Sequence, residues 1–284
     1  MEQTNVFKRK IYQEMLKWKE ERQGETALLI EGARRIGKST IVEEFAKNEY
    51  SSYILVDFSK TATEINNLFN DLSDLNYIFL RLQLNYNVSL KERKSLIIFD
   101  EVQNNPKARQ AIKHLVKDHR YDYIETGSLI SIRKNVQNII IPSEETRITM
   151  HPMDFEEFRW AMGDNVTFTL LKTVLEQKQP LGEATHRKLM RDFRLYMLVG
   201  GMPQAVDKYI KTNDLSAVDT VKRDIIALYE EDLRKIDTSG KATAMFDAIP
   251  SQLSKNASRY TISTVIPGEK QDRVSDIIQL MEES

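Results

Sequence analysis

The chain of 284 residues contains no cysteine. Disulfides, thiolate metal sites and cysteine nucleophiles are therefore excluded, and the composition fits a reducing cytoplasm. No uninterrupted apolar run approaches the roughly 20 residues that a membrane-spanning helix needs. The first residues, MEQTNVFKRKIYQEM, lack the apolar core of a signal peptide. We therefore expect a cytoplasmic protein with no membrane segment.

An excess of charge of one sign is also lacking. Lysine and arginine number 41 against 42 aspartates and glutamates, which gives a net charge of -1 at pH 7. Such a balance produces no global field that attracts nucleic acid or anionic lipid. Two local basic clusters are present, KRK at 8–10 and RKLMRDFR at 187–194. Charge runs of this kind are usually solvated helix faces, and binding of nucleic-acid phosphates is the less favoured alternative.

Histidine is scarce as well, with four in the chain and no two at a metal-ligand spacing. No Ser-His-Asp arrangement can be argued, and we expect no metal other than Mg²⁺. His114 falls between Ile112 and Leu115 in an expected helix. We expect it to be a partly buried packing residue.

What is present is an alternation of short apolar runs with helical patterns. Hydrophobic residues make up 41% of the chain, enough for a sizeable core. Strands are expected at 26–32, 52–58, 94–103, 121–128 and 146–153, and helices at 7–22, 38–48, 61–85 and 106–118. This order predicts an α/β fold, a parallel sheet with helices on both faces.

After about residue 154 the pattern becomes helical, without a clear strand. Helices are expected at 154–162, 168–177, 185–198 and 216–235, and further helical segments at 244–255, 259–266 and 272–284. Gly200-Gly201 breaks one helix and Pro203 starts the next, which indicates a hinge or a tight packing site. We expect three domains: a core at 1–158, a helical lid at 159–237 and a small helical module at 238–284.

The stretch GARRIGKST at 32–40 fits the pattern G-x-x-x-x-G-K-[ST] and stands between an expected strand and an expected helix. Glycines permit positive φ and close approach of the backbone to a phosphate, and N–H groups at a helix start face negative charge. Lys38 can reach the β and γ phosphates, and Ser39 can ligate Mg²⁺. The context disfavours a plain glycine turn. The residues expected to bind the nucleotide are Gly32, Ala33, Arg34, Arg35, Ile36, Gly37, Lys38, Ser39 and Thr40.

A second motif is SLIIFDE, where a buried strand ends in Asp100 and Glu101. Ligands of α/β sheets bind at the carboxyl ends of strands. Asp100 is placed to hold Mg²⁺, and Glu101 to orient an attacking water. Alone, the pair is more typical of a solvated turn, but the loop upstream favours the catalytic interpretation. The glutamate favours hydrolysis over transfer of phosphate to a small molecule.

Two weaker sets of candidates complete the site. YIETGS ends a strand with Thr126 and Ser128, one of which we expect near the γ-phosphate, with Thr126 preferred. The alternative is a strand-ending turn whose hydroxyls bond the backbone. Transition-state charge on the γ-phosphate calls for an arginine. Arg34, Arg35 and Arg147 are candidates, although each is more often structural, and a neighbouring subunit is another source.

Together, GARRIGKST, YILVDF, LIIFDEVQ, YIETGSL, MDFEEF and GGMPQAV resemble the prokaryotic AAA-like P-loop ATPases of the archaeal-ATPase type. The resemblance covers nearly the whole chain. It implies an additional-strand core with sheet order 5-1-4-3-2, then a helical lid and a winged-helix-like module. Because family members usually continue further, we expect that the C-terminal part is missing after Ser284.

The resemblance also implies site residues and a nucleotide. Its loop positions fall on Gly32, Gly37 and Lys38, its Mg²⁺ residues on Ser39 or Thr40 and on Asp100, and its catalytic glutamate on Glu101. Its sensor position falls on 126–128. ATP rather than GTP rests on this resemblance, since no guanine-reading motif such as N-K-x-D is visible.

The leading expectation is Mg²⁺-dependent ATP hydrolysis coupled to a conformational change of the lid. A nucleotide-gated regulatory module with little turnover, which binds DNA or a protein through its C-terminal helices, is the alternative. Self-association is also compatible with the sequence. A helicase is less favoured because no second sheet domain is visible, and a small-molecule kinase is less favoured because of Glu101. The process that ATP drives is not specified by the sequence.

Overall fold

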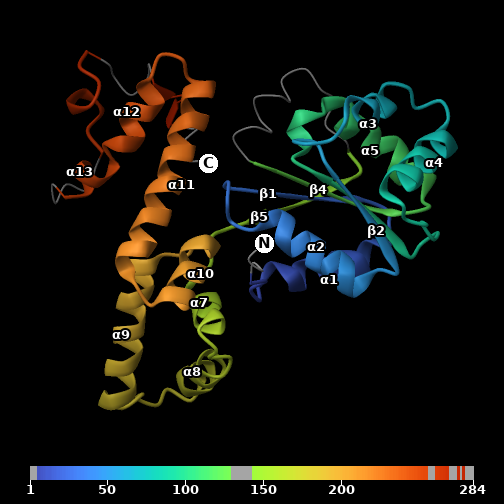
Figure 1. The fold of residues 1–284 in the computed structure, drawn as a ribbon. Helices are drawn as coiled ribbons and strands as arrows, with labels where there is room; N and C mark the ends of the chain where they lie inside the picture. Colours follow the sequence, from blue (N-terminus) through green and yellow to red (C-terminus); the bar gives the residue numbers. More distant parts are fainter. Residues whose placement is uncertain (1–4, 129–142, 255–259, 269–273, 276, 279–284) are drawn as a thin grey trace. The chain divides into compact units, whose positions relative to one another are not determined.

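A five-stranded parallel sheet forms the centre of the first part of the chain (Figure 1). The computed structural model describes residues 5–128, 143–254, 260–268, 274–275 and 277–278. The strands are β1 (Ala27–Gly32), β2 (Ser52–Asp57), β3 (Ser95–Asp100), β4 (Asp122–Ser128) and β5 (Glu145–Met150). Their order is β2-β3-β4-β1-β5. The expected order 5-1-4-3-2 is therefore confirmed.

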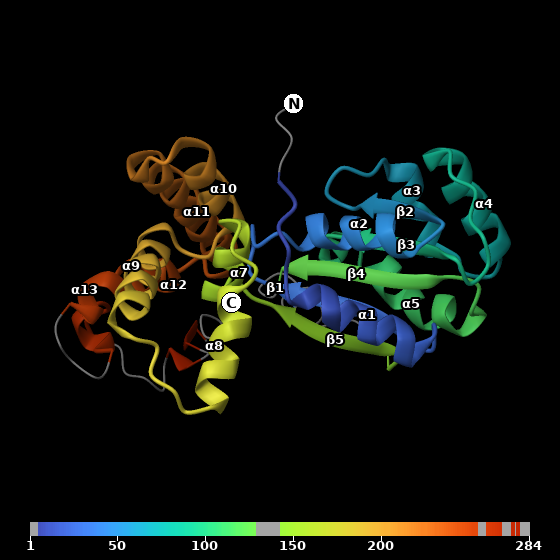
Figure 2. The ribbon, with the colours of Figure 1, turned by 90° about the horizontal axis from the view of Figure 1, so that it is seen from below.

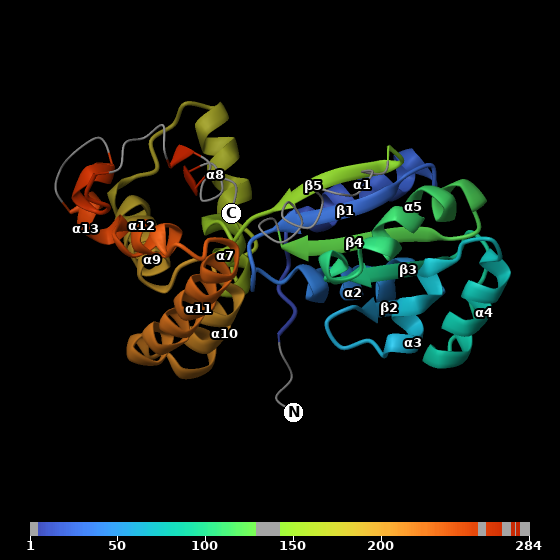
Figure 3. The ribbon, with the colours of Figure 1, turned by 90° about the horizontal axis from the view of Figure 1, so that it is seen from above.

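Helices cover both faces of the sheet because its central strands are apolar on both sides. The first cluster of buried residues joins one face to α1 (Ile11–Arg22) and α2 (Lys38–Glu49). The second joins the other face to α3 (Thr63–Asn67), α4 (Leu75–Tyr86) and α5 (Pro106–Asp118). Figure 2 shows α1 lying across β1, β4 and β5, and Figure 3 shows α5 beside β4, with α3 and α4 near β2 and β3.

The expected helix at 61–85 is divided. Between α3 and α4 lie a 3₁₀ turn, η1 (Leu68–Asn70), and a short irregular stretch. Asp71 accepts a hydrogen bond from the backbone N–H of Ser73, and Asp74 accepts one from that of Tyr77 at 3.0 Å. Aspartates that bond local N–H groups end one helix and cap the next. The expected helix is therefore divided because side chains cap its parts, and the spacing of apolar residues does not reveal such capping.

The strand register aligns the ends of three neighbouring strands. Ile30 of β1 is paired with Thr126 of β4, and Phe99 of β3 with Glu125 of β4. The loop after β1, the acidic residues after Phe99 and the end of β4 therefore meet at the carboxyl edge of the sheet. A second 3₁₀ turn, η2 (Val102–Asn104), follows β3, and the Asn105 side chain caps α5.

Helices follow the sheet, as expected. They are α7 (Phe155–Ala161), α8 (Thr167–Glu176), α9 (Glu183–Val199), α10 (Pro203–Thr212), α11 (Leu215–Ile236), α12 (Lys241–Asp247) and α13 (Ile249–Leu253), and a 3₁₀ turn, η3 (Ile262–Thr264), comes last. The chain divides into two compact units, 1–219 and 220–284. Among the described residues, no helix combines the length and the apolar character needed to cross a bilayer.

Three expectations about the C-terminal part are not decided by these elements. The domain boundaries after residues 158 and 237 remain predictions. The winged-helix-like character of the last module also remains one. Most of the helix expected at 272–284 lies outside the described residues.

Candidate functional site

The loop between β1 and α2 folds back tightly at both of its glycines. Gly32 has φ +153°, and a Cβ there would lie 2.2 Å from the carbonyl oxygen of Met150. Gly37, the residue before α2, has φ +93°, and Arg35 between them has φ +68°. Positive φ at these three positions curls the loop so that backbone N–H groups can face an anion. The loop therefore has the backbone shape that the sequence motif predicts.

The Lys38 side chain lies within this loop and is 6% exposed. Its Nζ donates hydrogen bonds to the carbonyl oxygens of Gly32 at 2.9 Å and Ala33 at 2.7 Å. Burial lowers the pKa of Lys38 to about 8, while the carboxylates of Glu101 and Asp100 oppose that shift. The ammonium is thus held at the loop by neutral carbonyls and remains available to an anionic ligand.

Asp100, at the end of β3, joins the start of α2 to the neighbouring strand β4. Its Oδ1 accepts a hydrogen bond from the Ser39 hydroxyl at 2.8 Å and another from the Thr126 hydroxyl. Asp100 is 6% exposed and Thr126 is 1% exposed. Three residues that are up to 87 positions apart in the sequence (39 to 126) therefore meet at one carboxylate oxygen.

Glu101, the residue after Asp100, has an unusual backbone conformation. Its φ is +53°, in the left-handed region that costs a non-glycine residue roughly 1–2 kcal/mol. Its N–H donates to the Thr126 hydroxyl at 3.4 Å, and its carboxylate accepts a hydrogen bond from Nε2 of Gln103. Strain of this kind is kept where surrounding contacts fix the residue, as at functional sites. Gln103, which the sequence left without a role, is a direct partner of Glu101.

The oxygen atoms at this edge fit Mg²⁺. Mg²⁺ prefers hard oxygen ligands and is usually held by one or two protein groups together with phosphate oxygens and water. The Ser39 hydroxyl and the Asp100 carboxylate already share a 2.8 Å hydrogen bond. Both groups are therefore within reach of a single cation, and their assignment to Mg²⁺ stays a prediction.

The candidate arginines do not share one location. Arg34 and Arg35 belong to the loop, where Arg34 is half-buried and Arg35 is exposed. Arg147 lies within β5, opposite Leu29 in the register, and its Nε is 2.6 Å from Glu145 Oε1. Arg147 is thus part of an ionic cluster beside α5, at a distance along the strand from the carboxyl edge.

One expectation about a polar residue is corrected. His114 is exposed on α5, because Ile112 and Leu115 lie on the buried face of that helix and His114 does not. In the KRK cluster at 8–10, Lys8 and Lys10 are exposed, as expected, and Arg9 is buried. Lys10 Nζ is 2.7 Å from Glu156 Oε2, and the Lys8 ammonium lies 4.5 Å from the centre of the Trp160 ring. These lysines contact α7.

Arg9 is a site residue that the sequence analysis missed. It is 6% exposed, and its Nη1 donates to the carbonyl oxygen of Ile36, inside the loop, at 2.8 Å. Its Nη2 donates to the carbonyl oxygen of His151 at 2.6 Å, and its Nε lies 3.2 Å from Glu157 Oε1. The burial of Arg9 could not be recognised from the sequence, since an arginine between two lysines is usually solvated.

The stretch GGMP at 200–203 packs against the same region. A Cβ at Gly201 would lie 2.1 Å from the Met153 carbonyl oxygen, and the Met153 N–H donates to the Gly201 carbonyl at 2.7 Å. Pro203 Cγ is 3.7 Å from the position of a Cβ on Gly37. Of the two expectations for GGMP, tight packing therefore describes the geometry at Gly201.

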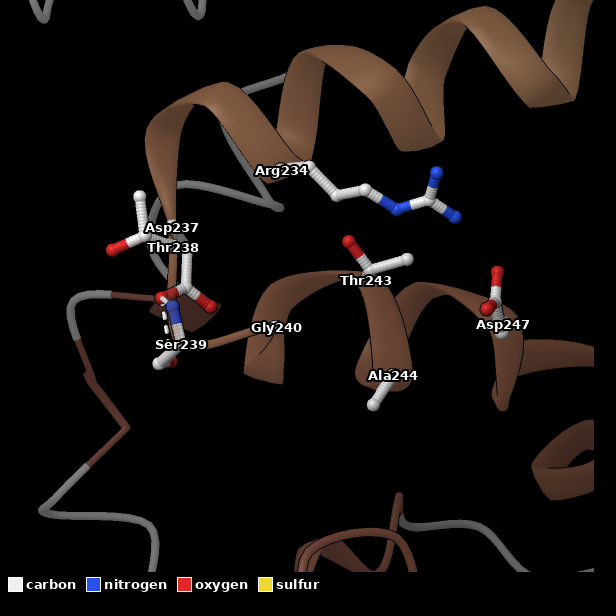
Figure 4. Close-up of a pocket in the computed structure, with 8 residues that line it drawn as sticks. All are labelled: Arg234, Asp237, Thr238, Ser239, Gly240, Thr243, Ala244 and Asp247. Atoms are coloured by element: carbon white, nitrogen blue, oxygen red, sulfur yellow. Dashed lines mark hydrogen bonds between the residues drawn. The ribbon is translucent and has the colours of Figure 1, made fainter.

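The second unit has a pocket of its own, with a volume of about 590 Å³ (Figure 4). The Thr243 hydroxyl faces it beside Arg234, and Asp237 and Asp247 also line it. One arginine with two carboxylates gives no uniformly positive field, and Asp237 is occupied by hydrogen bonds from Ser239 and Ala242. The pocket therefore suits a nucleotide phosphate less well than the loop after β1.

Two family models match the chain. Residues 24–159 match a model described as an AAA domain. Residues 190–284 match a model described as a domain of unknown function. The first range contains the loop, Asp100, Glu101 and Thr126, but not Arg9. No curated protein matches the chain.

Solved structures with some likeness include three proteins that share 10 to 12% of their residues with this chain. The Holliday junction branch migration motor RuvB of Thermotoga maritima is 10% identical, with a TM-score of 0.41 over 96% of this chain and 86% of its own. AMPPCP-bound DnaA from Aquifex aeolicus is 12% identical, with a TM-score of 0.41 over 96% and 88%. PCH-2 of C. elegans is 11% identical, with a TM-score of 0.38 over 74% and 64%. The fold of this chain is described from its own strand order and packing.

Proposed function

We propose that this chain, in which residues 24–159 form an AAA domain, binds ATP with Mg²⁺ and hydrolyses it at the carboxyl edge of the sheet. The expectation of an AAA-like P-loop ATPase core is confirmed over that range, and it supports nucleotide-dependent ATPase activity in general terms. The observation that carries the finer proposal is the Asp100 carboxylate. It accepts hydrogen bonds from Ser39 and Thr126 and is followed directly by Glu101.

Binding is assigned to the loop from Gly32 to Thr40. Its backbone N–H groups and the start of α2 cradle the phosphates, and Lys38 turns its ammonium from the loop carbonyls toward the β and γ phosphates. Ser39 and Asp100 would hold Mg²⁺, which when bound neutralises charge that develops on the phosphate oxygens. Such preorganised positive groups supply much of the stabilisation of a phosphoryl-transfer transition state.

Catalysis is assigned to Glu101 and Thr126. The Glu101 carboxylate orients the attacking water and accepts its proton, while Gln103 holds one carboxylate oxygen by a hydrogen bond. The Thr126 hydroxyl is placed between Asp100 and the N–H of Glu101, so it ties the metal-binding residue to the catalytic one. A displacement of Asp100 would therefore also displace Glu101, and the reverse.

The second candidate is a nucleotide-gated regulatory module with little turnover. The contact between Gln103 and Glu101 favours it, because the carboxylate oxygen that accepts this hydrogen bond is less available to an attacking water. In that case ATP binding would change the helices after the core, and the C-terminal helices would contact DNA or a protein. A cytoplasmic location, self-association and the movement of a helical lid belong to the proposal in either form.

Binding and turnover of ATP by the purified chain test the proposal, beside Lys38→Met and Ser39→Ala. We expect Lys38→Met to abolish detectable binding, because the buried ammonium is the cation closest to the loop backbone. We expect Ser39→Ala to bind ATP but to need much more Mg²⁺ for half-maximal phosphate release. An unchanged Mg²⁺ requirement in Ser39→Ala would contradict the metal assignment, and ATP binding by Lys38→Met would contradict the site.

A further inference from the structure

Arg9 contacts the loop from the side opposite to the one assigned to the nucleotide. It comes from the segment before α1, outside the range that matches the AAA domain. One guanidinium reaches the loop at Ile36, the end of β5 at His151 and the start of α7 at Glu157. The Arg9 side chain is 5% exposed and the Glu157 side chain 6%, so the ion pair is shielded from water.

The contact with Ile36 constrains the direction of a backbone N–H group. In a trans peptide the C=O of one residue and the N–H of the next point in opposite directions. The Ile36 carbonyl points to Arg9, so the Gly37 N–H points away from Arg9. Gly37 precedes Lys38 and its N–H belongs to the loop that is assigned to phosphate. Arg9 thus fixes the orientation of one of the phosphate-facing donors.

The partners of Arg9 are themselves held in place. Glu157 caps α7 together with Asp154: each side chain accepts a hydrogen bond from the other's backbone N–H. Glu157 also accepts a hydrogen bond from the Lys10 N–H at 2.6 Å. An ion pair whose carboxylate is already held by two hydrogen bonds loses little entropy when it forms. The position of Arg9 is therefore set by α7 as well as by its own segment.

We propose that Arg9 is a positioning residue for nucleotide binding, which holds the loop in its anion-binding shape and couples it, through Glu157, to α7. This inference rests on the proposed function, since it requires that the loop binds a nucleotide. If Arg9 is removed, the Ile36 peptide is free to rotate and binding must first restore its orientation. By reciprocity, a bound nucleotide stabilises the contacts of Arg9 with α7.

The test uses the full chain and compares Arg9→Ala, Arg9→Lys and Glu157→Gln with a matched control, Arg159→Ala. Arg159 also lies in α7, is 9% exposed and pairs with Asp164 and Asp192, but it does not contact the loop. Its loss reproduces the removal of a buried arginine ion pair from this helix. The readouts are the Kd for Mg-ATP, KM and kcat for phosphate release, and hydrogen exchange of the α7 amides with and without nucleotide.

We expect Arg9→Ala to raise Kd and KM by about tenfold or more, with kcat within about twofold, because Asp100, Glu101 and Thr126 are untouched. Arg9→Lys and Glu157→Gln are expected to raise Kd by about threefold. Nucleotide should slow exchange of the α7 amides in the parent and not in Arg9→Lys. Arg159→Ala should lose thermal stability with an unchanged Kd.

The parent decides between the two proposals. A parent that binds no ATP would overturn the proposed function and, with it, the role of Arg9. A parent that binds ATP, beside Arg9 variants with unchanged Kd, would overturn the role of Arg9 alone. An equal rise of Kd in Arg159→Ala would also overturn it, because general damage to α7 would then explain the effect. If Arg9→Ala does not fold, Arg9→Lys and Glu157→Gln carry the same comparison.

Discussion

We expect the affinity for ATP to depend on pH through the charge of Lys38. Burial lowers the pKa of its ammonium to about 8 in the free protein. A bound phosphate favours the charged form and raises that pKa again. Affinity for ATP should therefore be constant below pH 8 and fall as pH rises above it, by at most about tenfold per pH unit.

The measurement is the Kd for Mg-ATP between pH 7 and 9.5, in the parent and in Lys38→Arg. Arginine stays charged throughout this range. The variant should bind more weakly at pH 7 but show a nearly flat profile. A parent profile as flat as that of Lys38→Arg would mean that Lys38 does not titrate in the free protein.

Glu125 is a second buried titratable residue, on the α5 side of the sheet and outside the proposed mechanism. It is 0% exposed, and burial raises the pKa of its carboxyl well above the usual value. Arg109 opposes that shift but lies 3.1 Å from Glu145, with which it also pairs. The folded chain therefore keeps a proton on Glu125 at a pH where the unfolded chain loses it.

Because the folded chain holds this proton more tightly than the unfolded chain, Glu125 stabilises the protein less as pH rises. Above the unfolded pKa of about 4.3, the free energy of unfolding contributed by Glu125 falls as pH rises, by up to about 1.4 kcal/mol per pH unit. Glu125→Gln replaces the protonated acid by a neutral amide and should remove this slope. Urea unfolding at pH 5 and pH 8 measures it. Equal changes between the two pH values in parent and variant would contradict a protonated Glu125.

The joint between α9 and α10 packs closely against the backbone of Met153. Gly201→Ala would bring a Cβ to 2.1 Å from the Met153 carbonyl oxygen, and backbone must move to relieve the contact. We expect a loss of roughly 1–3 kcal/mol in the free energy of unfolding, as for other overpacked sites. Denaturant unfolding of the full chain measures it.

Gly200 provides the matched control for this prediction. Its φ is +83°, and a Cβ there would meet nothing within 4 Å. Gly200→Ala should therefore cost only the backbone penalty of a region that glycine alone adopts readily (φ +83°, ψ −179°), about 1–3 kcal/mol, and leave Met153 in place. Chemical shifts of Met153 should move in Gly201→Ala and not in Gly200→Ala. Unchanged shifts in both variants would refute the close packing.

Elements whose signals are contiguous in the sequence were predictable. The apolar run before Gly32 and the helical spacing after Lys38 specify a strand, a loop and a helix, and SLIIFDE specifies a strand with two carboxylates at its end. The strand order was expected from the family resemblance, and the register then brings Thr126 to Asp100. Local pattern and topology together were sufficient for this part of the site.

The contacts of Arg9 were not predictable in the same way. Arg9 is separated from Ile36 by 27 positions and from His151 by 142. Nothing in the KRK cluster distinguishes the buried arginine from its exposed neighbours. One usable signal was the Asp154-x-x-Glu157 spacing, which is typical of a capping box and marks the start of α7. The tertiary partner of that box still required the fold.

For the whole molecule, the proposal makes the nucleotide site part of unit 1. Residues 24–159 supply the loop and the acidic pair, while Arg9 and GGMP approach from sequence on either side of that range. Segments outside the range that matches the AAA domain model therefore contact the proposed site. A role for the second unit, with its own pocket, is separate from the hydrolysis proposed here.

The most direct test of the central claim is phosphate release from Mg-ATP by the full chain and by Glu101→Gln, with ATP binding measured for both. We predict that the parent turns over, and that the variant binds ATP within about threefold of the parent but releases phosphate at least about 100-fold more slowly. Equal turnover by the two proteins would contradict the role of Glu101. A parent that binds ATP without turnover would contradict hydrolysis and favour the regulatory module.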